Sequence, residues 1–131
     1  MIRIIVDANI ILSALLGGGA RFVLFSHRFE FVTTEFTLDE VKRYLPLVEI
    51  KSGVPVEELQ QMILLLPIIA YPKTHYRRAF PRARKVMKHI DPHDTDLLAL
   101  YFIERTYLWS EDKDFGKIEP PIRILKTKDF F

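Results

Sequence analysis

Cysteine is absent from this sequence of 131 residues. Without thiols, the chain can form no disulfide, no thiolate zinc site and no cysteine nucleophile. Such an absence is typical of proteins that work in a reducing compartment. We therefore expect a cytoplasmic protein whose chemistry rests on other side chains.

Long apolar runs are missing as well. The apolar stretch at the N-terminus is interrupted at Asp7, which is too early for a signal peptide. Runs such as Met62 to Leu66 are far too short to span a bilayer. We expect no membrane association.

Neither sign of charge dominates, because the formal net charge is only +2. Apolar residues make up 49% of the chain and charged residues 27%, a composition typical of folded globular proteins. A chain of this length is one ordinary domain with room for a full core. We therefore predict a single domain over residues 1–131.

Strand and helix patterns alternate along the chain. The β-branched run from Ile2 to Val6 is typical of a strand that is buried on both faces. Further strands are expected at 29–33, 67–72, 107–110 and 122–127, and helices at 10–15, 22–26, from Thr37, at 54–66, from about Pro81 and from Asp91. This order predicts a three-layer α/β/α fold with a central parallel sheet of about four to five strands. Trp109 is expected in the core.

Acidic residues follow the predicted strands. Asp7 ends the first strand and Asp112 follows the strand at 107–110, so both are expected at the carboxyl edge of the sheet, where ligands bind in open parallel sheets. The helix near Asp91 would bring Asp94 or Asp96 to the same edge. Mg²⁺ and Mn²⁺ prefer oxygen ligands of this kind.

Each acid also has a structural interpretation. Asp91 and Asp94 are suited to capping a helix N-terminus. Glu40 is expected in the first turn of a helix, where Thr37 and Glu40 have the spacing of a capping box. Asp114 suits a turn. Asp7 has the fewest structural roles, and the grouping of the acids favours a metal site.

Four segments resemble the motifs of PIN-domain nucleases, a family that includes the toxins of VapBC toxin–antitoxin pairs and related prokaryotic proteins. They are IIVDANIILSAL (4–15), TEFTLDEV (34–41), DPHDTDLLAL (91–100) and LWSEDKDF (108–115), and together they extend over most of the chain. The resemblance supports the PIN-like α/β/α fold.

The resemblance also implies site residues. The acidic quartet of the family corresponds to Asp7, Glu40, Asp94 and Asp112. Asn9 and Ser13 are implied to line the same pocket, and Asp114 to be a fifth acid. Many family members carry the third acid where this chain has Thr95. The Asp-Pro-x-Asp variant of the motif favours Asp94, and Asp96 is the alternative metal ligand.

An endoribonuclease activity follows from the same resemblance, with Mg²⁺ or Mn²⁺ as cofactor and products with 5′-phosphate and 3′-hydroxyl ends. The resemblance also implies an antitoxin protein and a second copy of the chain as partners. The apolar helix at 57–66 is a candidate for the dimer surface, and the alternative is that its apolar residues belong to the core.

A basic stretch without acidic residues extends from Gln60 to Ile90. We predict that it binds RNA phosphates and that Tyr76 and Phe80 stack on unpaired bases. The RNA-binding residues are expected to be Arg77, Arg78, Arg82, Arg84 and Lys85. The alternative is a solvated cationic helix whose aromatic residues belong to the core.

Two other classes of protein are compatible with parts of the pattern. A phosphoryl-accepting receiver domain also gathers Asp residues around Mg²⁺, but it requires an acidic pair after the first strand, and Asp7 is the only acid there. A PIN fold that binds RNA or a partner with little catalysis is the second alternative. Mg²⁺- or Mn²⁺-dependent RNA cleavage distinguishes it from the nuclease.

Overall fold

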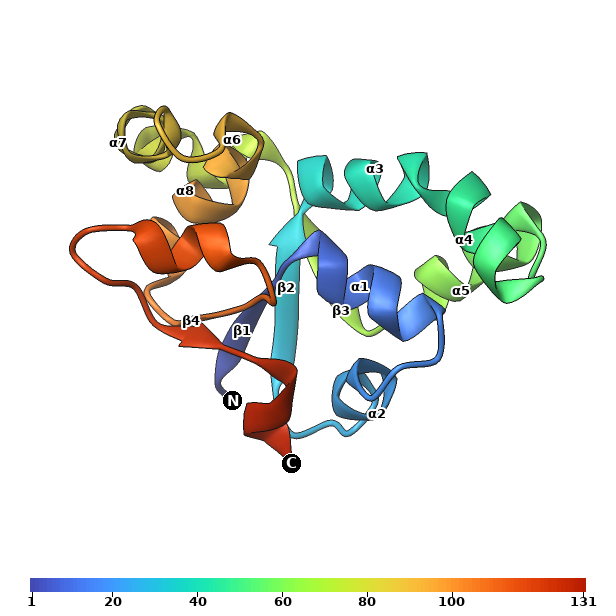
Figure 1. The fold of residues 1–131 in the computed structure, drawn as a ribbon. Helices are drawn as coiled ribbons and strands as arrows, with labels where there is room; N and C mark the ends of the chain where they lie inside the picture. The colour runs from blue at the N-terminus through green and yellow to red at the C-terminus, as the bar shows by residue number, and fades with distance from the viewer.

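Five parallel strands form one central sheet in the order β3-β2-β1-β4-β5 (Figure 1). The computed structural model describes all 131 residues. The strands are β1 (Arg3–Val6), β2 (Glu30–Thr34), β3 (Ile68–Tyr71), β4 (Tyr107–Trp109) and β5 (Ile124–Leu125). The predicted parallel sheet is confirmed, although the strand expected at 122–127 is reduced to the two residues of β5.

Helices cover both faces of the sheet, which confirms the three-layer architecture. One layer holds α1 (Ala8–Leu15), α2 (Ala20–Leu24), α3 (Glu35–Arg43), α4 (Leu45–Ser52) and α5 (Val56–Leu65). The other holds α6 (Lys73–Tyr76), α7 (Phe80–Met87) and α8 (Thr95–Glu104). Single 3-10 turns lie at Arg77–Ala79, Pro92–Asp94, Lys113–Lys117 and Thr127–Phe130.

Successive residues of β1 face opposite layers, as strand geometry requires. Ile4 and Val6 belong to the core cluster shared with α1 to α5, whereas Ile5 belongs to the cluster shared with α7 and α8. Trp109 is completely buried, and its ring centroid lies 4.5 Å from that of Phe130. The prediction that Trp109 is a core residue is confirmed.

The strand order places a crevice at the carboxyl ends of β1 and β4. From β1 the chain moves through β2 to β3 on one side of the sheet, and β4 and β5 extend it on the other side. Such a switch point separates the loops that follow neighbouring strands and leaves room for a ligand between them. Asp7 and Asp112 follow these two strands directly.

The start of α3 differs from the sequence expectation. Thr34 is the N-cap, and its hydroxyl oxygen accepts a hydrogen bond from the Thr37 amide at 2.9 Å. The helix therefore begins at Glu35, and Glu40 lies beyond its first turn. The predicted capping box between Thr37 and Glu40 is wrong, because a better cap three residues earlier moves the start of the helix. Glu40 is thereby left without a capping role.

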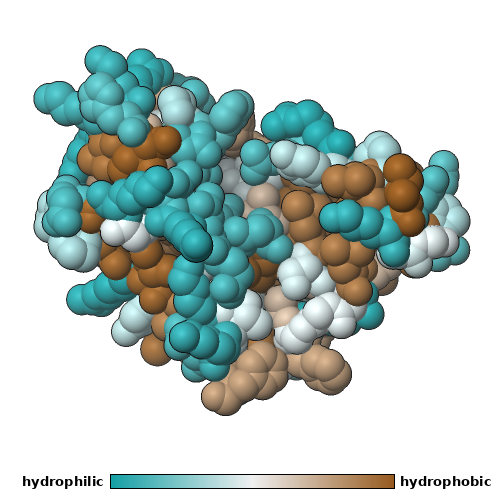
Figure 2. All heavy atoms as spheres, viewed as in Figure 1, coloured by the Kyte–Doolittle hydropathy of each residue, from teal (hydrophilic) through white to brown (hydrophobic).

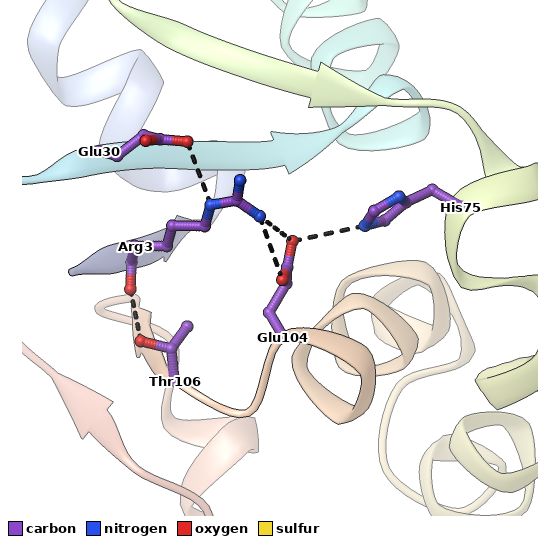
Figure 3. A network of polar contacts seen from close by, with 5 residues as sticks. All are labelled: Arg3, Glu30, His75, Glu104 and Thr106. Carbon is purple, nitrogen blue, oxygen red and sulfur yellow. Dashed lines mark hydrogen bonds and ion pairs between the residues drawn. The ribbon is translucent and has the colours of Figure 1, made fainter. Parts of the chain in front are cut away.

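Ion pairs connect the amino ends of β1 and β2 at the end of the sheet that lies opposite the crevice (Figure 3). Arg3 contacts Glu30 at the start of β2 and Glu104 at the end of α8, each at 3.1 Å. His75 on α6 lies 3.4 Å from the same Glu104 carboxylate, and the Thr106 hydroxyl donates to the Arg3 carbonyl. The network joins the second helical layer to the amino ends of the strands, away from the acids.

None of the helices has the length and apolar character that crossing a membrane requires.

Candidate active site

An acidic pocket of about 220 Å³ opens at the carboxyl ends of β1 and β4, near the N-terminal ends of α1 and α8. Its carboxylates come from four separate parts of the chain: Asp7, Glu40, the pair Asp91 and Asp94, and Asp112. Asn9, Tyr44 and His93 also line it, and no lysine or arginine does. The negative charge of the pocket is therefore not compensated by a cation of its own wall.

Asp7 lies at the base of the pocket, where β1 gives way to α1. It is only 5% exposed, and its carboxylate accepts hydrogen bonds from the Ala8 amide at 2.7 Å and the Ser110 hydroxyl at 2.6 Å. Burial raises the pKa of Asp7 to about 6. The two hydrogen bonds oppose this rise in pKa, and the charges of Asp112 and Glu40 add to it.

Ser110 connects the two strand ends. Its hydroxyl donates to Asp7 and accepts a hydrogen bond from the Asp112 amide at 3.0 Å. Asp112 in turn accepts a hydrogen bond from the Asp114 amide at 2.9 Å, which caps the following turn. Sequence reasoning did not select Ser110. The available signal was a polar residue that ends an apolar strand two positions before an acid.

Asp94 occupies the short turn that leads into α8. Its Oδ2 atom is buried and has no hydrogen-bond partner. Burial raises the pKa of Asp94 to about 8, and the charges of Asp7, Asp91 and Asp112 contribute further. A buried carboxylate oxygen without a partner is costly unless another group, such as a cation, satisfies it.

Asp114 and Asp91 complete the acidic surroundings of Asp94. One carboxylate oxygen from each of Asp91, Asp94 and Asp114 can lie within 4.8 Å of the others, a grouping that could hold a metal ion. Asp91 also accepts a hydrogen bond from the His93 amide at 3.0 Å, so its predicted capping role is confirmed. Asp114 is paired with Lys117 at 2.8 Å.

Asp96 is not brought to the pocket. Its carboxylate accepts a hydrogen bond from the Tyr76 hydroxyl, and the residue is only 7% exposed. Two residues along a helix turn a side chain by about 200°, so Asp94 and Asp96 point in different directions. Asp94 is therefore the acid of this segment that faces Asp7 and Asp112. The expectation that Tyr76 stacks on bases is wrong, because Tyr76 is buried.

Ser13 does not line the acidic pocket either. It lies one helical turn beyond Asn9 on α1 and faces a neighbouring cavity with Glu111 and three lysines. The two pocket residues that the sequence analysis grouped together thus belong to adjoining cavities.

The basic stretch folds into α6, a 3-10 turn and α7. Arg82, Arg84 and Lys85 line a shallow cavity together with Pro81 and Lys88, and Arg77 and Arg78 are exposed. The Arg82 guanidinium lies 4.0 Å from the centre of the Phe102 ring, and that of Arg84 lies 5.0 Å from the centre of Phe80. Their cationic groups remain accessible. RNA binding by this stretch stays a prediction.

The donor set of the acidic pocket fits a hard divalent cation. Every strong ligand atom in it is a carboxylate oxygen, as Mg²⁺ and Mn²⁺ prefer. Burial, with a further contribution from the neighbouring carboxylates, raises the pKa values of Asp7 and Asp94, so the pocket disfavours their charged forms. Together with the unpartnered Asp94 Oδ2, they mark a site that a cation would complete.

Fold and pocket together define an α/β domain with an acidic site at the switch point of a parallel sheet. A family model described as the PIN domain matches residues 5–127, and the chain belongs to this family. The resemblance inferred from the motifs is thus confirmed.

Two solved structures share the fold. The first is a chain of the crystal structure of VapBC2 from Rickettsia felis bound to a DNA fragment from its promoter. The similarity has a TM-score of 0.72 and 15% sequence identity, and it covers 95% of this chain and 98% of the VapBC2 chain. This chain is also similar to one in FitAcB from Neisseria gonorrhoeae, with a TM-score of 0.66, 20% identity and the same two coverages. No curated protein sequence matches the chain significantly.

Proposed function

We propose that this PIN domain is a metal-dependent endoribonuclease that hydrolyses phosphodiester bonds at the acidic pocket. The observation that carries the proposal is the buried Asp94 Oδ2 atom, which has no hydrogen-bond partner while four further carboxylates line the same pocket. A purely structural acid would be expected to have its partner in the fold, as Asp96 has in Tyr76.

Asp7, Asp94 and Asp112 are the residues proposed to hold Mg²⁺ or Mn²⁺, with Asp114 beside them. A bound ion of this kind makes an attacking water more acidic and stabilises the charge that develops on the leaving oxygen. Asp7 is held in a fixed orientation by Ser110 and the Ala8 amide, so it is preorganised as a ligand. Ser110 acts through Asp7 and Asp112 and is therefore a positioning residue.

Glu40 is proposed to handle the proton of the attacking water. Its carboxylate is partly buried at the rim of the pocket and forms no hydrogen bond or ion pair, so it is available as a base. Water oxygen bonds to phosphorus, the bond from phosphorus to the 3′ oxygen breaks, and the proton of the water passes to Glu40. The departing 3′ oxygen takes a proton from solvent water and leaves as the 3′-hydroxyl. Asn9 presents an amide to the same space.

The test is RNA cleavage by purified protein with EDTA, Mg²⁺ or Mn²⁺. Wild type should cleave only with the metal, and Asp7→Asn should lose essentially all cleavage while staying folded. Metal-independent cleavage, or cleavage by Asp7→Asn at the wild-type rate, refutes the assignment. A folded wild-type chain that binds RNA but never cleaves it supports the alternative of a PIN-fold binding module.

A protein partner is proposed as well. If that partner is an antitoxin, the chain is the toxin of a toxin–antitoxin pair. Four large apolar side chains of α4 and α5 are strongly exposed: Leu47, Ile50, Leu64 and Leu65. Figure 2 shows apolar side chains gathered on the side of the molecule where α4 and α5 lie. Exposed apolar patches mark protein interfaces, and an antitoxin or a second copy would bury this one. Coexpression with the product of the adjacent reading frame tests the antitoxin. Sedimentation of the chain alone tests the homodimer.

A further inference from the structure

Beside the acidic pocket lies a cavity that carries charge of the opposite sign. It is open, has a volume of about 560 Å³, and is lined only by polar residues: Ser13, Glu111, Lys113, Lys126, Thr127 and Lys128. We call it the lysine cradle. None of its three lysines forms an ion pair with an acid, so the positive charge remains available for a ligand.

The lysine cradle and the acidic pocket share a wall. Asn9 and Asp112 line the acidic pocket, and the chain neighbours of Asp112, Glu111 and Lys113, line the cradle. The Glu111 amide also donates to the Asn9 side-chain oxygen at 3.4 Å. Ser13 follows Asn9 by one turn of α1. A polymeric ligand that is bound in the acidic pocket and extends across this wall therefore enters the cradle.

The segment that carries two of the lysines is held in place. The Thr127 amide donates to the Glu111 carboxylate at 2.7 Å, and the Trp109 indole donates to the Thr127 hydroxyl at 3.1 Å. Phe130 packs against Trp109 with ring centroids 4.5 Å apart. These contacts fix the backbone between Lys126 and Lys128. Glu111, whose carboxylate is the only one in the cradle, is thereby hydrogen-bonded to the Thr127 amide.

The part of the cradle formed by Ser13 requires a glycine at position 18. A Cβ atom at Gly18 would lie 2.6 Å from the Ser13 hydroxyl oxygen, closer than atoms can approach without a shift. The absence of a side chain at position 18 therefore leaves Ser13 room to face the cradle. Its hydroxyl forms no hydrogen bond within the chain and is free to donate to a ligand.

We propose that Lys113, Lys126 and Lys128 bind the backbone phosphates of the RNA strand adjacent to the phosphate held at the acidic pocket. This inference rests on the proposed ribonuclease function. Five clustered carboxylates repel a polyanion, so RNA needs compensating cations close by. Lysines neutralise phosphates independently of base sequence, and grooves for single strands follow the backbone in this way. The cradle supplies that charge on the α1 side of the pocket.

The experiment measures binding without cleavage. Anisotropy of a labelled single-stranded RNA is titrated in EDTA at several salt concentrations with wild type and with Lys113→Ala/Lys126→Ala/Lys128→Ala. The matched control, Lys42→Ala/Lys51→Ala/Arg123→Ala, removes the same charge from exposed positions outside both the cradle and the basic stretch. A third variant replaces the three cradle lysines by arginine. Melting curves check that all variants are folded.

Three phosphate contacts on a single strand correspond to a decrease of about 2 in the slope of log K against log salt. The cradle alanine variant should show this decrease and bind RNA about 100-fold more weakly at 0.1 M salt. The control and the arginine variant should stay within a few-fold of wild type. Equal affinities for the cradle and control alanine variants overturn the proposal and leave the ribonuclease assignment standing. Wild type that binds no RNA overturns both.

Discussion

Replacing Asp7 by Asn should stabilise the metal-free protein at alkaline pH. Asn keeps the shape of the side chain, can accept from the Ala8 amide and can donate to the Ser110 hydroxyl, so both hydrogen bonds of Asp7 have a replacement. What the substitution removes is a buried negative charge close to Asp112 and Glu40. The rise of the Asp7 pKa from 3.8 to about 6 corresponds to about 3 kcal/mol between the two protonation states.

The sign of the pH dependence follows from linkage. Because the pKa of Asp7 is higher in the folded than in the unfolded chain, its contribution to stability is fully present below about pH 4. That contribution is lost as the pH rises through about 6. Wild type and Asp7→Asn should therefore have similar stabilities at pH 4. At pH 8 the variant should be more stable by about 3 kcal/mol, or roughly 10 °C in melting temperature.

Thermal melting in EDTA at pH 4, 6 and 8 measures this difference, with Asp39→Asn as the control for loss of an exposed acid from α3. Added Mn²⁺ at pH 8 should raise the melting temperature of wild type, because a ligand that binds only the folded state stabilises it. The variant should lose most of that rise. If Asp7→Asn is less stable than wild type at pH 8 and responds equally to Mn²⁺, Asp7 is a structural cap and the metal site is refuted.

Three further predictions concern the same surroundings. Mn²⁺ affinity should weaken by up to about 10-fold per pH unit below the Asp94 pKa of about 8, because the ion must displace a proton from Asp94. Titration calorimetry measures this affinity, and an unchanged value between pH 8 and pH 6 contradicts the prediction. Ser110→Ala should weaken metal binding by about 10- to 100-fold, as loss of an orienting partner does, and should lower stability by roughly 1 to 3 kcal/mol. Unchanged values for both would remove Ser110 from the site. Changing Arg77, Arg78, Arg82 and Arg84 together to Ala should lower the salt slope of single-stranded RNA binding by about 3 without altering metal affinity. Unaltered RNA affinity at low salt means that α7 faces solvent or a protein.

The sheet was predictable because its determinants are local. The run from Ile4 to Val6 is apolar on both faces, and both faces are covered by helices in the structure. Asp7 and Asp112 follow neighbouring strands, so parallel topology alone brings them to one edge. The start of α3 was not predictable from the Thr37 and Glu40 spacing, because Thr34 caps the Thr37 amide and starts the helix three residues earlier.

Side-chain direction was the part of the site that the sequence left open. Asp94 and Asp96 differ by two positions at the beginning of α8, and only the backbone geometry there decides which one faces the pocket. Tyr76 on α6 donates a hydrogen bond to Asp96 on α8, and no sequence pattern predicts a contact between these two separate helices. Ser13 lies one helical turn beyond Asn9 on α1 and lines the cradle, because the C-terminal segment with Lys126 to Lys128 packs beside that turn.

Manganese-dependent RNA cleavage by Asp94→Asn and Asp96→Asn, compared with wild type, tests the central claim most directly. Both variants remove one acid from the same segment, but only Asp94 lines the acidic pocket. Asp94→Asn should lose cleavage by several orders of magnitude at saturating Mn²⁺, whereas Asp96→Asn should retain a rate within a few-fold of wild type, because Asn can still accept from Tyr76. Full activity of a folded Asp94→Asn variant would contradict the account.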